Sequence, residues 1–304
     1  MRILKILRKV ALYVYTIIYR CLIKFNKNNK VALCCIAKCE NDYINEFINY
    51  YKQLGVDKIF IYDNNDFEGE DLPKKIKSEI DLGFCEVIDY RGKKKCQLEA
   101  YQECYDKYKN EFGWFLFFDC DEYLTLKKHK FIKEYLSQKQ FKKFQIIHIN
   151  WMVYGDNDLL FNDGRGVLER FRHPIYPYDF VKDDYPENNL TKSIIRGGLK
   201  EINWVHNPHT PYSDKMINRC CNSVGKECNP NYTLVPFDFT IAYIRHYCTK
   251  TISEWILIKQ KRGYPDQYDN EIGSKLDIDV FFKYNRWTEE KQEIVNKYKN
   301  KTNK

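Results

Sequence analysis

The sequence lacks several features that define familiar protein classes. Its twelve cysteines include no Cys-x-x-Cys pair, and no internal repeat or domain-length linker divides its 304 residues. No nucleic-acid-binding motif accompanies the net charge of +8. These absences argue against a zinc ribbon, a disulfide scaffold, a repeat array and a nucleic-acid-binding module.

The first 25 residues lack acidic side chains, and they also lack an apolar run long enough to cross a bilayer. Their longest uncharged run, residues 10–19, is about half of the roughly 20 residues that a spanning helix needs. No small-residue cleavage site follows, so a secretory signal peptide is not expected.

The same segment has the periodicity of an amphipathic helix. Its apolar face contains Ile3, Leu7, Val10, Val14, Ile18 and Cys21, and the opposite face contains Arg2, Lys5, Lys9, Thr16 and Arg20. This pattern predicts that residues 1–27 lie in the interface of an anionic membrane, with their cations near lipid phosphates. Docking of the helix on the protein's own core, or on a partner, is the alternative.

The overall composition is that of a globular protein, with 44% hydrophobic and 30% charged residues. Much of the basic excess lies at the two ends of the chain, and lipid or a diphosphate substrate suits it better than nucleic acid. The cysteines fall within apolar strands or helices, where we expect small buried thiols in a reducing compartment.

From residue 31 onward, strands and helices alternate. We expect strands at residues 31–37, 58–62, 84–90 and 114–118 and helices at residues 43–54 and 95–108. The first strand is a continuous apolar run, which suits burial on both faces, and Gly55 ends the first helix. Such alternation predicts an α/β fold with a mostly parallel sheet flanked by helices.

The pattern becomes looser after residue 149. We expect strands at residues 192–196 and 240–247, a helix at 252–262 and a last helix from 287 toward 299. Thr251 and Glu254 form the capping box of the helix at 252–262, and Gly263 ends it. We interpret residues 28–263 as one catalytic domain and residues 264–304 as a helical extension.

Three acids directly follow the strand at 114–118, and they carry the strongest chemical signal. Asp119, Asp121 and Glu122 lie at the carboxyl edge of the predicted sheet, where open α/β folds bind ligands. Carboxylates spaced i, i+2 can both approach one hard cation, which also accepts phosphate oxygens. Asp119 and Asp121 are therefore the predicted ligands of Mn²⁺ or Mg²⁺, which neutralises charge on a departing diphosphate. A solvated acidic turn is the alternative.

Two further loops leave the same edge of the sheet. Lys38 and Glu40 follow the first strand, and Asp63 and Asn64 follow the second, so both loops can border one nucleotide. Asp63 is placed to accept hydrogen bonds from a uracil or from ribose hydroxyls. Helix capping and turn formation are the alternatives for Asp63 and Asn64.

Residues 37–46 read AKCENDYINE, residues 54–65 read LGVDKIFIYDNN and residues 117–122 read FFDCDE. In that order, they resemble the A-K-N-E-x-x-Y-I-x-E opening, the second strand and the metal motif of glycosyltransferase family 92 and of related family 2-like bacterial enzymes. Downstream, the motifs WMVYG, ERF, KSI, VHNP and HYCTKTISE follow in the family's order, at residues 151–155, 169–171, 192–194, 205–208 and 246–254. Cys39 departs from the pattern, which has Asn at that place.

The resemblance covers residues 31–263 and implies a GT-A fold, an inverting mechanism and a nucleoside-diphosphate sugar donor, often UDP-galactose. It also implies roles for individual residues. His246 resembles the third metal ligand of GT-A enzymes, with His206 as its competitor, and Lys250 resembles a lysine paired with the diphosphate. Cys120, between the two metal-binding acids, is assigned to the donor-binding set.

An inverting transfer needs a base that takes the proton of the acceptor hydroxyl. Asp156 is the first choice, because its loop, directly after residues 151–155, resembles the acceptor loops that carry the base. Asp158 and Glu169 are alternatives, although Glu169 could serve only as a partner of Arg170. Trp151 is assigned to the acceptor side.

The sequence therefore predicts an enzyme, a metal-dependent inverting hexosyltransferase of surface polysaccharide synthesis. Its expected substrates are a UDP-sugar and a glycan or glycolipid, and it is expected in the cytoplasm, bound peripherally to the inner face of the cell membrane. A haloacid-dehalogenase-like phosphatase is the rival enzyme. Its D-x-D motif has Thr or Val four residues after the first Asp, where this chain has Tyr123. A catalytically inactive GT-A-like binding protein at a membrane is the non-enzymatic alternative.

Overall fold

The computed structural model describes residues 2–22, 28–175, 190–200, 202–204, 207–211, 219–229, 235, 238–263 and 277–285, together with residues 289, 293, 296 and 297. His206 and most of the extension predicted at 264–304 lie outside these residues. The last helix, expected from residue 287, is described at four helical positions only.

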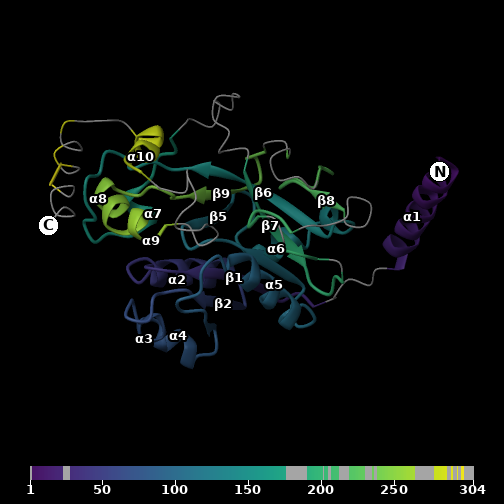
Figure 1. Ribbon diagram of the computed structural model, residues 1–304, viewed down its shortest axis with the longest axis horizontal. Coiled ribbons are helices and arrows are strands. Elements are labelled where there is room, and N and C mark those ends of the chain that lie inside the picture. The colour runs from purple at the N-terminus through teal and green to yellow at the C-terminus, as the bar shows by residue number, and fades with distance from the viewer. Residues whose placement is uncertain are drawn as a thin grey trace.

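The described chain forms a nine-stranded sheet with the order β3-β2-β1-β4-β7-β6-β9-β5, and β8 pairs with β6 (Figure 1). The strands are β1 Val31–Ala37, β2 Lys58–Asp63, β3 Cys85–Asp89, β4 Trp114–Phe117, β5 Glu122–Leu126, β6 Ile146–Val153, β7 Thr191–Arg196, β8 Cys220–Cys221 and β9 Ala242–His246. Strands β3, β2, β1 and β4 are parallel, β7 is antiparallel to both of its neighbours, and β9 is parallel to β6 but antiparallel to β5. This confirms the predicted α/β class with a mostly parallel sheet.

Helices cover both faces of this sheet. They are α1 Arg2–Leu22, α2 Ile44–Leu54, α3 Leu72–Lys75, α4 Lys77–Asp81, α5 Gln97–Tyr108, α6 Ile132–Leu136, α7 Val167–Arg170, α8 Ile252–Glu254, α9 Gln260–Arg262 and α10 Ile278–Tyr284, with a π-helical segment, Trp255–Lys259, between α8 and α9 and a 3₁₀ turn, Lys139–Phe141. Leu33 and Cys35 of β1 pack in one core with α2, whereas Ala32 and Cys34 pack in a second core with α5. Both faces of β1 are therefore buried, as its unbroken apolar run predicts.

The predicted helix signals are present in the structure. Gly55 ends α2 with φ 90°, the left-handed conformation that glycine adopts without strain. Thr251 and Glu254 form the reciprocal capping box of α8, and Gly263 follows α9. The strand and helix ends differ from the expected ones by one or two residues, as at β9, which begins at Ala242 rather than at residue 240.

The cysteines behave as small apolar residues. Eleven described cysteines carry free thiols; eight of them are buried and the other three are partly buried. The described thiols therefore follow the burial that the sequence predicts.

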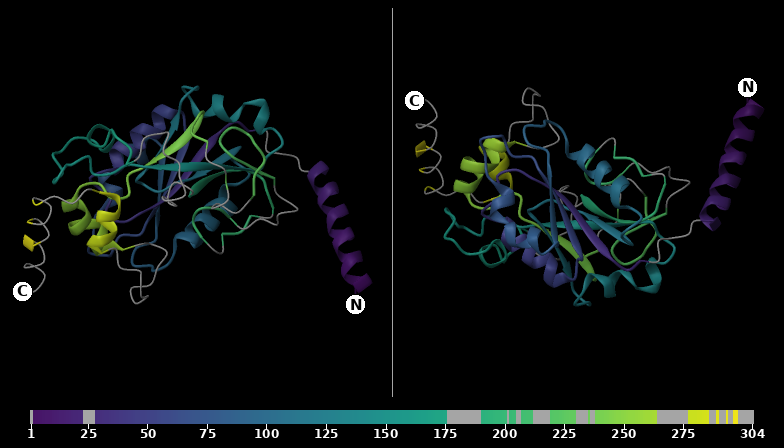
Figure 2. Two further views of the ribbon diagram at one scale, coloured as in Figure 1. Left: turned by 90° about the horizontal axis from the view of Figure 1, so that it is seen from above. Right: turned by 90° about the horizontal axis from the view of Figure 1, so that it is seen from below.

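The amphipathic helix α1 is formed, and it projects from the end of the molecule opposite α7, α8, α9 and α10 (Figures 1 and 2). Its apolar residues Leu7, Val10, Val14 and Ile18 are all about half exposed, so they do not pack on the protein's own core. None of the described helices combines the length and the apolar character needed to cross a membrane.

Candidate active site

A cavity of about 600 Å³ opens along the carboxyl ends of β1, β2, β3 and β4. Its walls also include Trp151 of β6, Lys192 of β7 and His246 of β9, and it is lined as well by Lys259 and by Tyr284 of α10. The size lies within the range of small-molecule sites, and the position is the edge at which open α/β sheets bind ligands. The predicted loops therefore do converge on one cavity.

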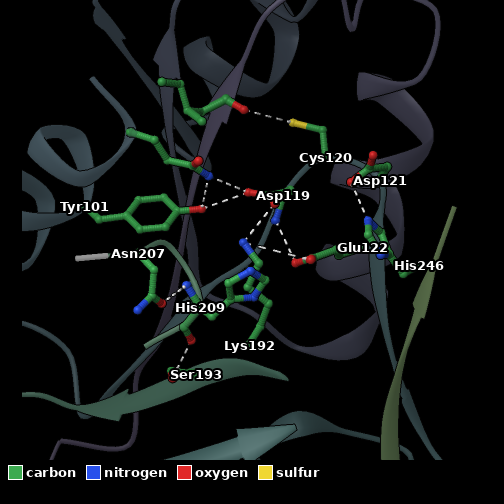
Figure 3. A network of polar contacts seen from close by, with 12 residues as sticks. Tyr101, Asp119, Cys120, Asp121, Glu122, Lys192, Ser193, Asn207, His209 and His246 are labelled. Atoms are coloured by element: carbon green, nitrogen blue, oxygen red, sulfur yellow. Dashed lines mark hydrogen bonds and ion pairs between the residues drawn. The ribbon is translucent and has the colours of Figure 1, made fainter. Parts of the chain in front are cut away.

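Asp119 follows β4, and donors surround its carboxylate. Oδ1 accepts hydrogen bonds from Gln97 and Tyr101 of α5, and Oδ2 accepts one from Lys192 Nζ at 2.8 Å (Figure 3). Burial alone would raise the pKa of Asp119, but the Lys192 ammonium lowers it below its ordinary value. Asp119 is therefore ionised and held in a fixed orientation.

Glu122, the third acid of the motif, lies beneath the cavity rather than in it. Its Oε2 accepts the backbone N–H of Asp119 at 2.9 Å, and its Oε1 lies 3.9 Å from Lys192 Nζ. The side chain is fully buried, and burial raises the pKa of Glu122 well above its usual value. Glu122 thus supports the turn that presents Asp119 and Asp121.

Asp121 lines the cavity beside His246. Its Oδ1 lies 3.7 Å from His246 Nε2, and its Oδ2 accepts a hydrogen bond from Lys259 Nζ at 3.1 Å. Burial would raise the pKa of Asp121, but the nearby Lys259 ammonium and further cations hold it far below its ordinary range. Burial lowers the pKa of His246 to about 4, so its ring is neutral at physiological pH.

Trp151 separates two histidines on one wall of the cavity. Its ring lies 4.0 Å from the His246 ring and 5.0 Å from the His209 ring, measured between centroids. His209 Nδ1 lies 3.1 Å from the Thr191 carbonyl oxygen, which can only accept, so Nδ1 carries the hydrogen and Nε2 is the acceptor nitrogen. Burial, and then Lys192, lower the pKa of His209 to about 3.

Several predicted donor-binding residues line the cavity. Lys38 pairs with Asp66 at 3.0 Å, Glu40 pairs with Arg262, and Cys120 lies between the two acids. Asn64 also lines the cavity, and its amide donates to the carbonyls of Tyr90 and Lys93, which ties together the loops after β2 and β3.

The loop after β1 explains why the resembling motif has Asn where this chain has Cys39. Cys39 adopts φ 56°, the left-handed region in which Asn is among the most tolerated side chains. Its backbone N–H is held by Asn65 Oδ1 at 2.9 Å, so the loop keeps this conformation although the side chain differs.

Other predicted residues are not brought to the cavity. Asp63 and Lys250 are not among the described residues that line the cavity. The Asp63 carboxylate accepts hydrogen bonds from Asn65 and from Arg91, so it fastens loops beneath the cavity. The Lys250 ammonium lies 4.2 Å from the centre of the Tyr43 ring.

The two predicted bases also lie outside the described lining. Asp156 is buried beside it, where its backbone N–H donates to Asn285, the neighbour of cavity-lining Tyr284. Glu169 is 52% exposed and lies 3.7 Å from Arg165. The suggested pairing of Glu169 with Arg170 is wrong, because Arg170 forms a bidentate pair with Glu254.

The structure adds residues that the sequence analysis did not assign. Lys192, Gln97 and Tyr101 orient Asp119, while Lys259 and His209 face the same cavity. These residues lie far from the acids in the sequence, and no spacing rule connects them. Only the KSI motif drew attention to Lys192, without giving it a role.

The acids and the neutral imidazole are donor types that would suit a divalent cation. Within the described part of the chain, no three His, Cys, Asp or Glu side chains are gathered closely enough to hold a metal ion. Mg²⁺-type cations, however, commonly use one or two carboxylates and take their remaining ligands from phosphates and water. Asp121 lies beside His246; its carboxylate is ionised, and the imidazole of His246 is neutral. Metal binding requires these protonation states.

The fold and the cavity agree with the GT-A glycosyltransferase class that the motifs predict. Residues 31–275 match the sequence model of the family described as Glycosyltransferase family 92. The chain therefore belongs to glycosyltransferase family 92, and the prediction of a glycosyltransferase is confirmed at the level of the family. The phosphatase alternative is thereby set aside.

Individual relatives are more distant. A glycosyltransferase family 92 protein of Ricinus communis is 30% identical over 110 residues, which are 35% of this chain and 18% of that protein. One of Arabidopsis thaliana is 29% identical over 111 residues, again 35% of this chain and 18% of the relative. The chain thus matches less than a fifth of the length of these plant proteins.

Solved structures show weaker likeness. Residues 1–349 of S. aureus TarS are 14% identical, with a TM-score of 0.33 and coverage of 55% of this chain and 47% of that fragment. The corresponding TarS structure in complex with UDP is 13% identical, with a TM-score of 0.34 and coverage of 55% and 46%.

Proposed function

We propose that this protein transfers a hexose, with inversion, from a nucleoside-diphosphate sugar to a hydroxyl of a glycan or glycolipid. UDP-sugars are the favoured donors and Mn²⁺ or Mg²⁺ the metal. The observation that carries the proposal is the charge of the cavity. Basic side chains outnumber acidic ones in its lining, and the ionised Asp119 and Asp121 lie among them. Its basic lining residues are Lys38, Lys93, Lys94, Lys95, Lys192, Lys259, Lys261 and Arg262, against the acids Glu40, Asp66, Asp119 and Asp121.

The excess of cations suits a diphosphate. Low-dielectric walls focus the field of such a cluster and raise the local concentration of an anionic substrate. Asn64 and the three consecutive lysines 93–95 lie at the end of the cavity formed by the loops after β2 and β3, where the nucleoside would bind. The diphosphate would then point toward Asp119 and Asp121.

The metal would be held by Asp121 and His246, with Asp119 beside them. When bound, it would neutralise negative charge on the departing nucleoside diphosphate. Lys192 holds Asp119 in place, and the buried Glu122 holds the backbone of the same turn. These side chains keep the acidic pair preorganised before the substrate arrives.

The acceptor would enter on the side of Trp151 and Tyr284. An indole presents a flat apolar surface with a polar edge, which suits one face of a sugar ring. The acceptor loop points to Asp156 as the base. The cavity points to His209, whose Nε2 is the acceptor nitrogen of its ring. Burial and Lys192 lower the pKa of this ring to about 3, so His209 would act as the base only once the negative charge of a bound diphosphate raises that pKa. We propose these two as alternatives, and the cavity-lining His209 is the first to test.

A peripheral membrane location is the second part of the proposal. Helix α1 combines exposed Leu7, Val10, Val14 and Ile18 with five Lys or Arg residues and no acid. Such a helix binds the interface of anionic membranes by burying its apolar side while its cations approach lipid phosphates. This location, on the inner face of the cell membrane, would suit transfer to a lipid-linked acceptor in surface polysaccharide synthesis.

The catalytic proposal is tested with a panel of UDP-, GDP- and dTDP-hexoses. We expect one UDP-hexose to raise the melting temperature of the protein more with Mn²⁺ present than without it, and to be consumed in the presence of glycan acceptors. If no nucleotide sugar stabilises the protein, the proposed donor class is wrong. If EDTA leaves turnover unchanged, the proposed metal dependence is wrong.

A further inference from the structure

An ammonium group lies on the acid that we propose as the principal metal ligand. Lys259 Nζ donates to Asp121 Oδ2 at 3.1 Å, while His246 Nε2 lies 3.7 Å from Oδ1 of the same carboxylate. The side chains of Asp121 and Lys259 are 5% and 13% exposed, so their ion pair is largely shielded from water.

The backbone that carries Lys259 is firmly anchored. Lys259 is the last residue of the π-helical segment Trp255–Lys259, and π-helical turns occur frequently at functional sites. Trp255 is buried at the start of this segment, and Glu254 before it is fixed by a bidentate pair with Arg170. The backbone is therefore held, while the flexible four-carbon stem of the lysine can direct its ammonium to more than one partner.

The ammonium and a divalent cation compete for Asp121. Both are positive, and at contact distance from one carboxylate they repel each other strongly in a shielded site. A diphosphate that enters the cavity offers the ammonium a new anionic partner, because Lys259 lines that cavity. The metal could then occupy Asp121 without the repulsion.

We infer that Lys259 occupies the cation position of Asp121 in the substrate-free protein and moves to the donor diphosphate when the metal binds. Metal binding and diphosphate binding are then coupled, and each strengthens the other. This inference rests on the proposed function, because it assumes that Asp121 binds a metal beside a diphosphate. In this role, Lys259 is a positioning residue that keeps the affinity for metal low until the donor diphosphate is bound.

The test measures Mn²⁺ binding rather than turnover. Full-length protein is titrated with Mn²⁺, alone and with saturating UDP, and free Mn²⁺ is followed by electron paramagnetic resonance. For the unaltered chain we expect UDP to tighten Mn²⁺ binding by about 5- to 150-fold, the usual range of coupling between two sites. Lys259→Met should bind Mn²⁺ at least about fivefold more tightly without UDP. It should also show a smaller enhancement by UDP than the unaltered chain, because only the direct contacts between phosphate and Mn²⁺ then contribute.

A matched variant separates this effect from a general change of charge. Lys261 also lines the cavity and is exposed, and no contact between it and Asp121 is seen. Lys261→Met removes the same charge and should leave the Mn²⁺ affinity without UDP within about twofold, less than the smallest usual coupling. Thermal unfolding without ligands verifies that both variants are folded.

The possible failures differ from one another. If Lys259→Met binds Mn²⁺ no more tightly than the unaltered chain while UDP still enhances binding, the inference is overturned and the proposed function stands. If both lysine variants tighten Mn²⁺ equally, the effect is general charge and the specific role of Lys259 is overturned. If UDP binds but no variant takes up Mn²⁺ with it, the metal site itself is wrong and the inference fails with it.

Discussion

Lys192 places one ammonium group between two acids of the same turn, with its Nζ 2.8 Å from Asp119 Oδ2 and 3.9 Å from Glu122 Oε1. Its side chain is 1% exposed, and Glu122 is fully buried. Burial would lower the pKa of Lys192, but the two acids raise it above the ordinary value. Lys192 on β7 is therefore the counter-charge of the acidic motif at the end of β4.

Lys192→Met should consequently destabilise the fold. Removing the ammonium leaves Asp119, whose side chain is 31% exposed, and the buried Glu122 without their shared partner, which costs about 1–3 kcal/mol. Urea unfolding of the variant measures this loss. The double variant Lys192→Met/Asp119→Asn should recover part of it, because the acid that stays ionised without its counter-charge is made neutral. Equal stability of the single variant and the unaltered chain would show that Lys192 is not a structural counter-charge.

Asp121→Asn should nearly abolish sugar transfer while the fold survives. The substitution preserves the shape of the side chain but removes the charged ligand, so the metal's stabilisation of the departing diphosphate is lost. We expect turnover to fall by on the order of 10²-fold or more, which corresponds to several kcal/mol of transition-state stabilisation. Product formation is measured with excess Mn²⁺, and circular dichroism verifies the fold. Transfer that resists both this substitution and EDTA would exclude a metal at Asp121.

The sequence predicts the parallel half of the sheet well, for a physical reason. Strands β1, β2 and β4 are apolar runs buried on both faces, and helices of clear periodicity separate them. It also predicts that Asp119 and Asp121 line the ligand edge, because the end of a parallel strand fixes that position.

The partners of these acids could not be predicted in the same way. Lys192 lies 73 residues from Asp119 and Lys259 lies 138 residues from Asp121. Their encounters depend on β7 inserting antiparallel beside β4 and on a π-helical turn, and neither feature leaves a periodic signal. For Asp63 the position after a strand is misleading. It predicts a ligand contact, but Asn65 and Arg91 donate hydrogen bonds to the Asp63 carboxylate.

Arg170 and Glu254 form a second buried pair, and its loss should be detectable by stability alone. The two guanidinium nitrogens lie 2.8 and 2.9 Å from the carboxylate oxygens, and the side chains are 1% and 6% exposed. Arg170→Met should cost about 3–5 kcal/mol in the free energy of unfolding. Glu169→Gln, at the exposed neighbour, is the matched control and should stay within about 0.5 kcal/mol.

The same pair predicts a pH dependence. Burial raises the pKa of Glu254, but hydrogen bonds from Arg170 and Thr251 outweigh it, and the pKa is lowered below the ordinary 4.5. A depressed pKa in the folded state stabilises the protein above about 4.5, and this stabilisation is lost as the pH falls through the folded value. The free energy of unfolding should therefore fall more steeply below pH 4.5 in the unaltered chain than in Glu254→Gln. Parallel curves for the two proteins would contradict this assignment.

Deletion of residues 1–25 should abolish membrane binding and leave a folded enzyme. Each basic residue near an anionic surface contributes about 1 kcal/mol, and the exposed apolar side chains add their burial in the interface. Sedimentation with phosphatidylserine-containing vesicles at physiological salt measures the binding. Leu7→Ser/Val14→Ser preserves all charges and should weaken binding, whereas a purely electrostatic helix would be unaffected. Full-length protein that ignores such vesicles would show that α1 serves another purpose.

The base is identified by comparing His209→Asn with Asp156→Asn. An asparagine amide can replace the His209 Nδ1–H that donates to Thr191, but it offers no basic nitrogen, so the structural contact is kept and proton transfer is lost. If His209 is the base, His209→Asn should bind the UDP-sugar with unchanged affinity in calorimetry and turn over acceptor about 10²- to 10⁴-fold more slowly. Azide rescue is the second measurement that distinguishes the two candidates. Azide is a nucleophile that carries no proton, so it needs no base and should restore cleavage of the donor in the base-deficient variant, giving a glycosyl azide and UDP. We expect this rescue in His209→Asn, because His209 lines the cavity, and not in Asp156→Asn. Normal turnover by His209→Asn, together with an azide-rescued loss in Asp156→Asn, would assign the base to Asp156.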